Sequence, residues 1–144
     1  MQILGMLKAT RESEAGAPPS KELIERMGGF VEEVTKAGVM LSTNGLHPSA
    51  RGKRVRMSNG KVTVIDGPFT ESKELVASYA LFQVKSMDEA VYWTKRFLEV
   101  LGQGECELRP IFEPENFSAE VFTPDERARE GATREQMKKN ASKR

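Results

Sequence analysis

The chain has 144 residues, of which 38% are hydrophobic and 30% are charged, and its formal net charge is +1. This length and composition predict one soluble globular domain with a buried core. The near-neutral charge, and the lack of a long basic cluster in the first 122 residues, argue against nucleic acid as a partner of that core.

Three further features predict a cytoplasmic protein without a membrane partner. The segment Met1–Leu7 lacks the positive region and the cleavage site of a signal peptide. No segment approaches the roughly 18 apolar residues that a membrane span requires. The single cysteine, Cys106, excludes an internal disulfide and fits a reducing compartment.

A strand over residues 2–9 is followed by a polar loop and by a helix over residues 21–37. Ser20 is a residue type that caps helices, and Gly38 is suited to end one. Two consecutive glycines, residues 28–29, lie within this helix, and each weakens it by roughly 1 kcal/mol relative to alanine. We therefore expect a neighbouring element to pack closely against this pair.

A second strand, residues 39–43, leads to the clearest local signal in the chain, a hairpin over residues 54–64 with Asn-Gly at its tip. Asn-Gly between alternating strands is typical of a two-residue type I′ turn. The register that follows from this turn places Lys53 opposite Asp66.

The longest predicted strand covers residues 76–84 and is apolar on both faces. Phe82 and Val84 point to one face, whereas Tyr79 and Leu81 point to the other. Since an antiparallel sheet with one solvated face alternates more regularly, both faces of this strand should be covered. Two helices can cover one face, and we expect a second copy of the chain to cover the other.

A second helix begins at Ser86, which forms a capping box with Glu89, and ends at Gly102 or Gly104. A last strand over residues 105–112 follows. The order is therefore strand, helix, strand, hairpin, strand, helix, strand. This order predicts an α+β fold of the ferredoxin-like, split βαβ plan, with an inserted β-hairpin.

The chain divides into a core domain, residues 1–113, and a charged extension, residues 114–144. Two capping-box patterns that begin at Thr123 and Thr133 predict short helices in the extension. Residues 123–144 carry seven basic and four acidic side chains, and we expect the extension to pack on the core or on a partner.

The segments GKRVRMSNGKVTVIDGPFTESKEL, SMDEAVYW and CELRPIFE contain the most distinctive motifs of the chain: DGPF at residues 66–69, the E-x-K-E that follows it, and a closing E-x-R-P. In these motifs the sequence resembles the YCII-related proteins, in their DGPF branch. The resemblance covers about residues 1–113 and implies a ferredoxin-like protomer that forms a dimeric α+β barrel. It also implies a link to sigma factors of the extracytoplasmic-function type, beside whose genes DGPF proteins are often found.

A related branch of this family implies a catalytic His-Asp pair, and one relative is similar to a dehydrochlorinase that acts on a chlorinated hydroquinone. That branch places its histidine on the first helix, but the predicted helix over residues 21–37 contains none. Asp66 matches the acid of the DGPF motif directly. The only histidine of this chain is His47, in the loop after the second strand.

Asp66 has two interpretations. In the first, it begins a turn in which its carboxylate accepts hydrogen bonds from the following N–H groups while Pro68 fixes its own φ. In the second, it is a cleft carboxylate that acts as a general base or anchors a ligand, and Lys53 sets its electrostatic environment. His47 is the candidate acid, because an imidazole can exchange a proton near neutral pH; its alternative is an exposed polar loop residue.

Four residues are candidates for binding a substrate: Lys53, Arg56, Glu71 and Arg109. The alternative for Arg56 is a charged hairpin edge that discourages strand addition. The alternative for Arg109 is an ion pair with Glu107 or Glu71. The chain has no glycine-rich phosphate loop and no nucleophile elbow, and we expect neither a metal nor a cofactor.

Together these features predict a homodimer that binds a small organic molecule in a polar cleft near Asp66. If the protein is an enzyme, the residues suit cofactor-free, lyase-like acid–base chemistry. The alternative is a non-catalytic accessory or regulatory module linked to extracytoplasmic-function sigma factors. The sequence leaves both hypotheses open.

Overall fold

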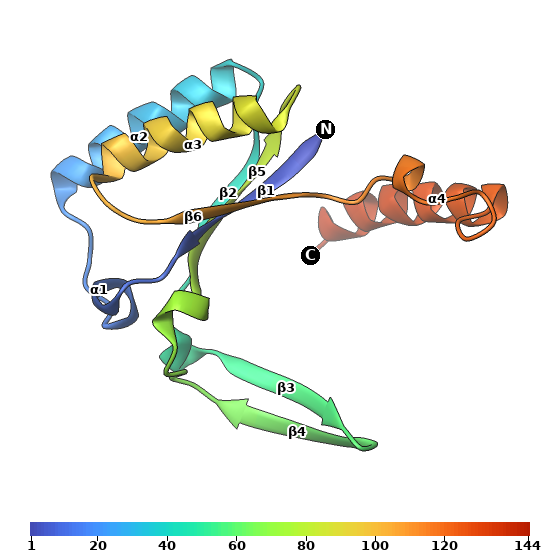
Figure 1. Ribbon diagram of the computed structural model, residues 1–144, viewed down its shortest axis with the longest axis horizontal. Helices are drawn as coiled ribbons and strands as arrows, with labels where there is room; N and C mark the ends of the chain where they lie inside the picture. Colours follow the sequence, from blue (N-terminus) through green and yellow to red (C-terminus); the bar gives the residue numbers. More distant parts are fainter. The chain divides into compact units, whose positions relative to one another are not determined.

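The computed structural model describes all 144 residues, which form two compact units (Figure 1). The first unit is Met1–Ile111 and the second is Phe112–Arg144, so the division lies close to the predicted end of the core domain. None of the helices is both long enough and apolar enough to cross a membrane.

The first unit is built on a four-stranded antiparallel sheet. Helix α2 follows the first strand of this sheet and helix α3 follows the third, which is the arrangement of two split βαβ units that share one sheet. The predicted α+β fold of the ferredoxin-like plan is thus confirmed. The strands are β1 (Gln2–Lys8), β2 (Met40–Gly45), β5 (Val76–Gln83) and β6 (Cys106–Pro110), in the spatial order β2-β5-β1-β6.

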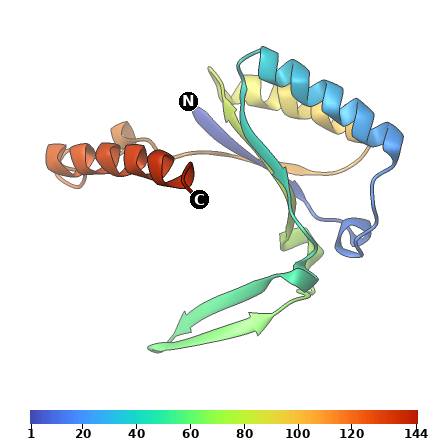
Figure 2. The ribbon, with the colours of Figure 1, turned by 180° about the vertical axis from the view of Figure 1, so that it is seen from behind.

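Helices α2 (Lys21–Lys36) and α3 (Met87–Leu101) lie side by side on one face of the sheet (Figures 1 and 2). The Ser20 hydroxyl accepts a hydrogen bond from an N–H in the first turn of α2 at 3.1 Å. The Ser86 hydroxyl does the same for α3 at 3.2 Å, so both predicted N-caps are confirmed. Gly102 then ends α3 with a φ of 89°, a left-handed conformation that glycine adopts without strain.

The core lies between this face of the sheet and the two helices. Phe30 of α2 contacts the rings of Trp93 and Phe97 on α3, with centroid distances of 6.4 and 6.2 Å. Ile3 of β1 and Val34 of α2 are completely buried, and each such side chain contributes about 1.5–3 kcal/mol of burial free energy. The buried cluster consists of Ile3, Phe30, Val34, Val39, Phe82, Val84 and Ala90.

The two glycines within α2 do not pack against a neighbour. A Cβ placed on Gly28 or Gly29 would have no atom within 4 Å, and both residues are exposed. The expectation of a close neighbour is therefore wrong. The pair lies on the solvent side of the helix, where no contact offsets the cost of glycine in a helix.

No helix of the first unit covers the opposite face of the sheet (Figure 2). On that face Leu4 lies opposite Leu81, and Met6 lies opposite Tyr79. All four side chains are only half-buried. The two central strands, β1 and β5, are therefore apolar on both faces, as the sequence predicts, and the helices of the first unit cover only one of these faces. On the uncovered face the edge strands are polar, with Ser42 and Asn44 on β2 and Glu107 and Arg109 on β6. We call the four apolar residues Leu4, Met6, Tyr79 and Leu81 the bare face.

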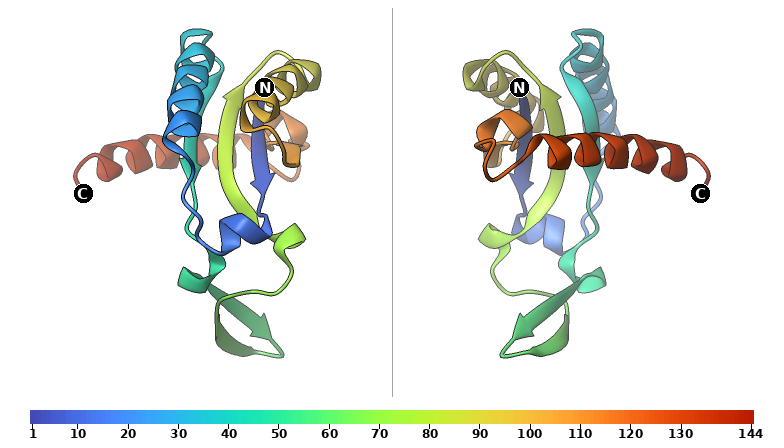
Figure 3. Two further views of the ribbon diagram at one scale, coloured as in Figure 1. Left: turned by 90° about the vertical axis from the view of Figure 1, so that its left-hand side faces the viewer. Right: turned by 90° about the vertical axis from the view of Figure 1, so that its right-hand side faces the viewer.

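Strands β3 (Lys53–Ser58) and β4 (Lys61–Asp66) form the predicted hairpin, separate from the main sheet (Figure 3). Asn59 and Gly60 at its tip have φ values of 51° and 76°, and a type I′ turn requires positive φ at both positions. The observed pairing is the predicted one. Every residue of the two strands is exposed.

The segment after β1 contains a short helix, α1 (Arg11–Glu14), where the sequence predicted only a loop. Thr10 and Ser13 exchange side-chain and backbone hydrogen bonds in a capping box. These bonds satisfy the backbone groups of a polar turn without burying it. The helix matters for the site because Glu14, its last residue, contacts the base of the hairpin.

The second unit contains one long helix, α4 (Pro124–Ala141), after a short 3-10 turn at Pro114–Asn116. The prediction of two short helices in this region is wrong. The Thr133 hydroxyl donates to the Arg129 carbonyl at 2.8 Å, so it bonds back within a continuous helix instead of capping a new one. Three aromatic rings cluster near the start of this unit: Phe112, Phe117 and Phe122.

Candidate functional site

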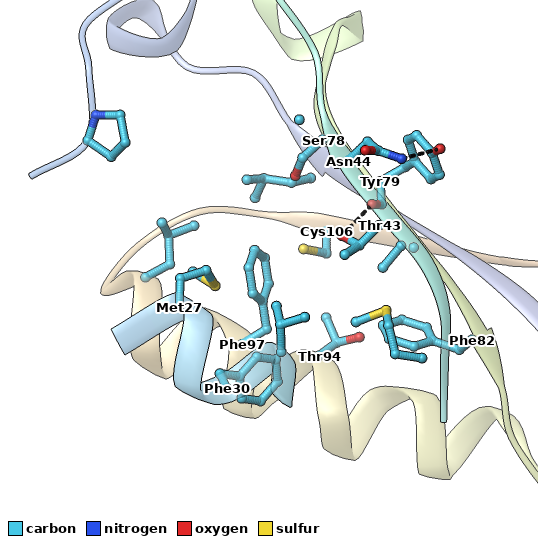
Figure 4. A pocket seen from close by; sticks show the side chains of 18 of the residues that line it. Met27, Phe30, Thr43, Asn44, Ser78, Tyr79, Phe82, Thr94, Phe97 and Cys106 are labelled. Carbon is cyan, nitrogen blue, oxygen red and sulfur yellow. Dashed lines mark hydrogen bonds between the residues drawn. The ribbon is translucent and has the colours of Figure 1, made fainter. Parts of the chain in front are cut away.

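An apolar pocket of about 570 Å³ lies between the main sheet and its two helices (Figure 4). The sheet strands form its floor, and α2 and α3 form its walls. Met27 and Phe30 of α2 and Phe97 of α3 point into this space in Figure 4. Leu23 and Leu101 extend the apolar walls. The pocket therefore continues the hydrophobic core toward the beginning of α2.

Small residues on the floor create the space for the pocket. Gly5, Gly45 and Ala80 contribute to the lining from β1, β2 and β5. A Cβ on Gly5 would lie 3.0 Å from a ring carbon of Phe82 and 3.2 Å from a methyl carbon of Leu108. The floor at Gly5 is thus in close contact with the core, and a larger residue there requires its neighbours to move.

Most polar groups of the lining already bond within the protein. The Thr43 hydroxyl donates to the Tyr79 carbonyl at 2.9 Å, and the Thr94 hydroxyl donates to the Ala90 carbonyl at 2.8 Å. The side chains of Asn44 and Tyr79 project to the opposite face of the sheet, where the Asn44 amide donates to the Tyr79 hydroxyl at 2.9 Å. Because a hydroxyl keeps acceptor capacity after it donates, the two threonines still offer a ligand weak polar contacts.

None of the residues that line the pocket carries a charge at neutral pH. Cys106 contributes a thiol, and burial, with a smaller effect from the charge of Glu105, raises the pKa of this thiol to about 11. The thiol is therefore protonated near neutrality and is not an activated nucleophile. The lining suits an apolar ligand and offers no charged group for proton transfer.

The DGPF segment lies at the base of the hairpin, where it contacts the loop before β3. The Gly67 N–H donates to the Gly52 carbonyl at 3.0 Å, and the Phe69 N–H donates to the Ser49 hydroxyl at 3.0 Å. A Cβ on Gly67 would lie only 1.7 Å from the Ser49 carbonyl oxygen. No residue other than glycine allows two backbone segments to approach so closely.

Glu14 and Arg54 complete this junction. The Ser49 N–H donates to Glu14 Oε2 at 3.0 Å, and the Ser49 hydroxyl donates to Glu14 Oε1. The Arg54 guanidinium lies 4.0 Å from the centre of the Phe69 ring, which is a cation–π contact. The junction joins α1, the loop and the hairpin, and it gives Gly67 and Phe69 a structural role.

Asp66 forms an ion pair with Lys53 across the hairpin. The two side chains remain 76% and 65% exposed, and such solvent-exposed pairs contribute little to stability. The predicted position of Lys53 opposite Asp66 is thus confirmed. The role of Asp66 as a base or a ligand anchor stays a prediction.

His47 lies in the loop that forms the same junction, two residues before Ser49. Its two ring nitrogens are 3.1 and 3.0 Å from Arg51 Nη1, and the residue is exposed. The loop of His47 lies against the DGPF segment through Ser49 and Gly52, but the His47 ring contacts Arg51 and the Asp66 carboxylate contacts Lys53. Catalysis by His47 and Asp66 remains a prediction.

The other candidate residues lie apart from one another. Arg109 of β6 pairs with Glu107 at 3.3 Å, which is one of the two alternatives predicted for it. The hydrogen bonds from Arg109 and then from Lys8 hold the pKa of Glu107 below its ordinary value. Arg56 is exposed on β3, and Glu71 is exposed just before the short turn at Ser72–Glu74.

None of the six residues predicted from the sequence lines the apolar pocket. The sequence did not reveal the pocket, because candidate sites were predicted from ionisable side chains and the pocket lining has no charged residue. A signal was present in the small residues Gly5, Ser78 and Ala80, which interrupt the apolar side of the strands facing the helices. The large side chains of α2 and α3 then have no partner of comparable size on the floor.

The match to a family model is the observation that decides what kind of protein this is. The model of the YCII-related domain matches residues 1–115, which include the whole first unit. The chain belongs to the YCII-related domain family. This YCII-related chain is also 30% identical, over 97 residues, to an uncharacterised protein of Rhizobium meliloti (strain 1021); the match covers 64% of this chain and 78% of that protein.

Among solved structures, the chain is similar to 5-chloro-2-hydroxyhydroquinone dehydrochlorinase from Burkholderia phenoliruptrix AC1100, in complex with 2,5-dihydroxybenzoquinone. It is 11% identical to the YCII-related chain, with a TM-score of 0.44, and the superposition covers 82% of this chain and 100% of that one.

Proposed function

We propose that this YCII-related protein is a homodimer that binds a small, largely apolar organic molecule in the pocket between its sheet and its helices. The pocket itself is the observation that carries the ligand-binding proposal, and the uncovered apolar face of β1 and β5 supports the homodimer. Its volume of about 570 Å³ lies within the roughly 300–1,000 Å³ that is typical of ligand sites. Its lining is also typical, since a few polar groups lie among many apolar ones.

This location differs from the polar cleft near Asp66 that the sequence suggested. The pocket belongs to the same unit, but its lining includes neither Asp66 nor His47. A ligand in the pocket would contact Met27, Phe97 and the methyl group of Thr43. The ligand should itself be uncharged, because no lining residue could neutralise a charge buried in the pocket.

The uncharged lining favours binding without proton transfer, and it therefore supports the accessory or regulatory alternative over catalysis within the pocket. Such a module would sense an apolar molecule, and a sigma factor of the extracytoplasmic-function type is the predicted recipient of the signal. Catalysis by Asp66 and His47 is the competing proposal, and it places a lyase-like reaction at the hairpin base. The arrangement of the loop of His47 beside the DGPF segment supports it.

Thermal-shift measurements with a panel of small aromatic and aliphatic probes test the pocket. Met27 points into the pocket, so Met27→Trp should fill part of it and abolish the shift produced by a bound probe. Arg26 is its exposed neighbour on α2, and Arg26→Trp is the matched control that should retain the full shift. The proposal is overturned if no probe stabilises the wild-type protein, or if Met27→Trp responds as the wild type does.

The same measurement separates the two places where a ligand could bind. Asp66→Asn and His47→Ala leave the pocket lining unchanged, so both should bind the probes as tightly as the wild type. If either variant loses the shift while Met27→Trp keeps it, the ligand binds at the hairpin base. Turnover of a probe by the wild type, but not by Asp66→Asn, would establish the catalytic proposal.

A further inference from the structure

The β3–β4 hairpin, residues 53–66, projects from the first unit as an arm that no other element of this unit covers. On one side of the arm Val55 lies opposite Val64, and Met57 lies opposite Val62. These four side chains are between 55% and 69% exposed. An isolated two-stranded hairpin is only marginally stable in water, so an arm with this apolar side is suited to pack against another surface.

The arm has a fixed direction because its base is held at several points. The Gly67 N–H bonds to the Gly52 carbonyl, and Phe69 is bonded to Ser49 and stacked under Arg54. The arm therefore starts from a rigid junction and not from a flexible linker. It points away from the helices, toward the side of the bare face (Figures 1 and 2). The two uncovered apolar surfaces of the unit thus lie on the same side.

Charge indicates what the arm contacts. The arm, residues 53–66, contains four basic side chains and one acidic side chain, Asp66. The remainder of the first unit, residues 1–52 and 67–111, contains eleven basic and thirteen acidic side chains. A basic arm is therefore attracted to the acidic body of another copy of the same chain, and opposite charges of this kind favour and orient association.

We propose that the β3–β4 hairpin is a dimerisation arm, whose apolar side packs against the second copy of the chain in the homodimer. The inference rests on the homodimer of the proposed function and adds a second contact to the one made by the bare face. In a symmetric pair each protomer extends its arm over the other, so the contact is made twice. The Asn-Gly turn and the DGPF junction then serve to present the arm.

Sedimentation equilibrium on paired variants tests the arm. Val55→Ser combined with Val64→Ser removes one apolar cross-strand pair and should raise the dimer dissociation constant at least tenfold. Arg56→Lys combined with Thr63→Ser alters the adjacent pair on the opposite side of the arm but keeps its charge, and it should change that constant by less than threefold. Circular dichroism establishes that both variants keep the fold.

Hydrogen exchange of wild-type residues 53–66 provides a measurement that does not depend on mutation. Exchange in the arm should slow as the protein concentration rises through the dissociation constant. A dimer whose arm exchanges equally fast at all concentrations, or whose two variant pairs dissociate alike, overturns the arm but leaves the homodimer. A wild-type protein that is monomeric at every concentration overturns both the arm and the homodimer, and ligand binding in the pocket is measured independently of either.

Discussion

Gly67 is the residue on which the DGPF motif depends in this structure. Its backbone approaches the Ser49 carbonyl so closely that even one methyl group has no space. The neighbouring loop cannot yield easily, because Ser49 is itself bonded to Glu14 and to Phe69. The motif is therefore explained by backbone contact first. Asp66, at its first position, stays available for another role because its carboxylate contacts only the exposed Lys53.

Gly67→Ala should lower the free energy of unfolding by at least about 3 kcal/mol, because the added Cβ would overlap a backbone oxygen and force the junction apart. Urea unfolding measures this loss. Gly45→Ala is the control: a Cβ there has no atom within 4 Å, and the variant should stay within about 0.5 kcal/mol of the wild type. Equal stability of the two variants would show that the junction adapts at little cost.

At the scale of elements, the sequence predicts what local chemistry determines. Ser20 and Ser86 cap the two helices as expected, and Asn59-Gly60 forms the expected turn. Two elements whose local signal is ambiguous were missed. The short helix α1 is one, because its Thr10–Ser13 capping box is short and polar, and the bonds from Ser49 to its Glu14 come from a distant loop. The continuity of α4 through Thr133 is another, because the same threonine can cap a helix or bond back within one.

The exposed glycines of α2 give a prediction about that helix. Gly29→Ala should raise the free energy of unfolding by about 1 kcal/mol, because alanine favours the helix and the new Cβ meets no atom within 4 Å. Chemical denaturation measures the gain. Gly38→Ala should do the reverse, since Gly38 has a φ of 76° that alanine adopts only with strain. A loss of stability in Gly29→Ala would mean that an unseen surface covers this side of α2.

The contact between α2 and α3 gives a prediction about pH. Two hydrogen bonds of 2.6 and 2.8 Å from Arg96 hold the pKa of Glu33 below its ordinary value of 4.5. A carboxylate with a lowered pKa in the folded state contributes stability that is complete above pH 4.5 and is lost as the pH falls through the lowered value. The stability difference between the wild type and Glu33→Gln should therefore shrink in this acidic range.

Denaturation of both proteins between pH 7 and acidic pH measures this difference. The exposed neighbour Glu32 makes no ion pair, so Glu32→Gln is the control whose difference from the wild type should stay small. A constant difference between the wild type and Glu33→Gln at all pH values would show that Arg96 does not favour the charged form of Glu33. Any stability lost in Glu33→Gln would then come from side-chain contacts that do not depend on the charge of Glu33.

For the whole molecule, the fold was more predictable than the site. Strand periodicity, two capped helices and one Asn-Gly turn suffice to order the elements of the split βαβ plan. The pocket depends on how far the helices stand from the floor, which no single residue encodes. Gly5 and Ala80 show the difficulty, because a small residue in a strand can equally mark a close approach of two elements. The charged residues that attract attention in the sequence are mostly paired at the surface, as Arg109 is with Glu107.

The bare face gives the prediction that concerns the assembly. If two copies pack these faces together, Leu81→Arg places an unpaired charge in an apolar contact at a cost of several kcal/mol. Each 1.4 kcal/mol corresponds to a tenfold change in affinity, so the dimer should weaken by at least about a hundredfold. Sedimentation velocity at micromolar concentrations should then detect a folded monomer.

Ala37→Arg, at the exposed end of α2, is the control that should remain dimeric. A Leu81→Arg protein that sediments as the wild-type dimer would show that the two copies contact each other through a different surface. The half-buried side chains of the bare face would then have to be covered by something other than the second copy.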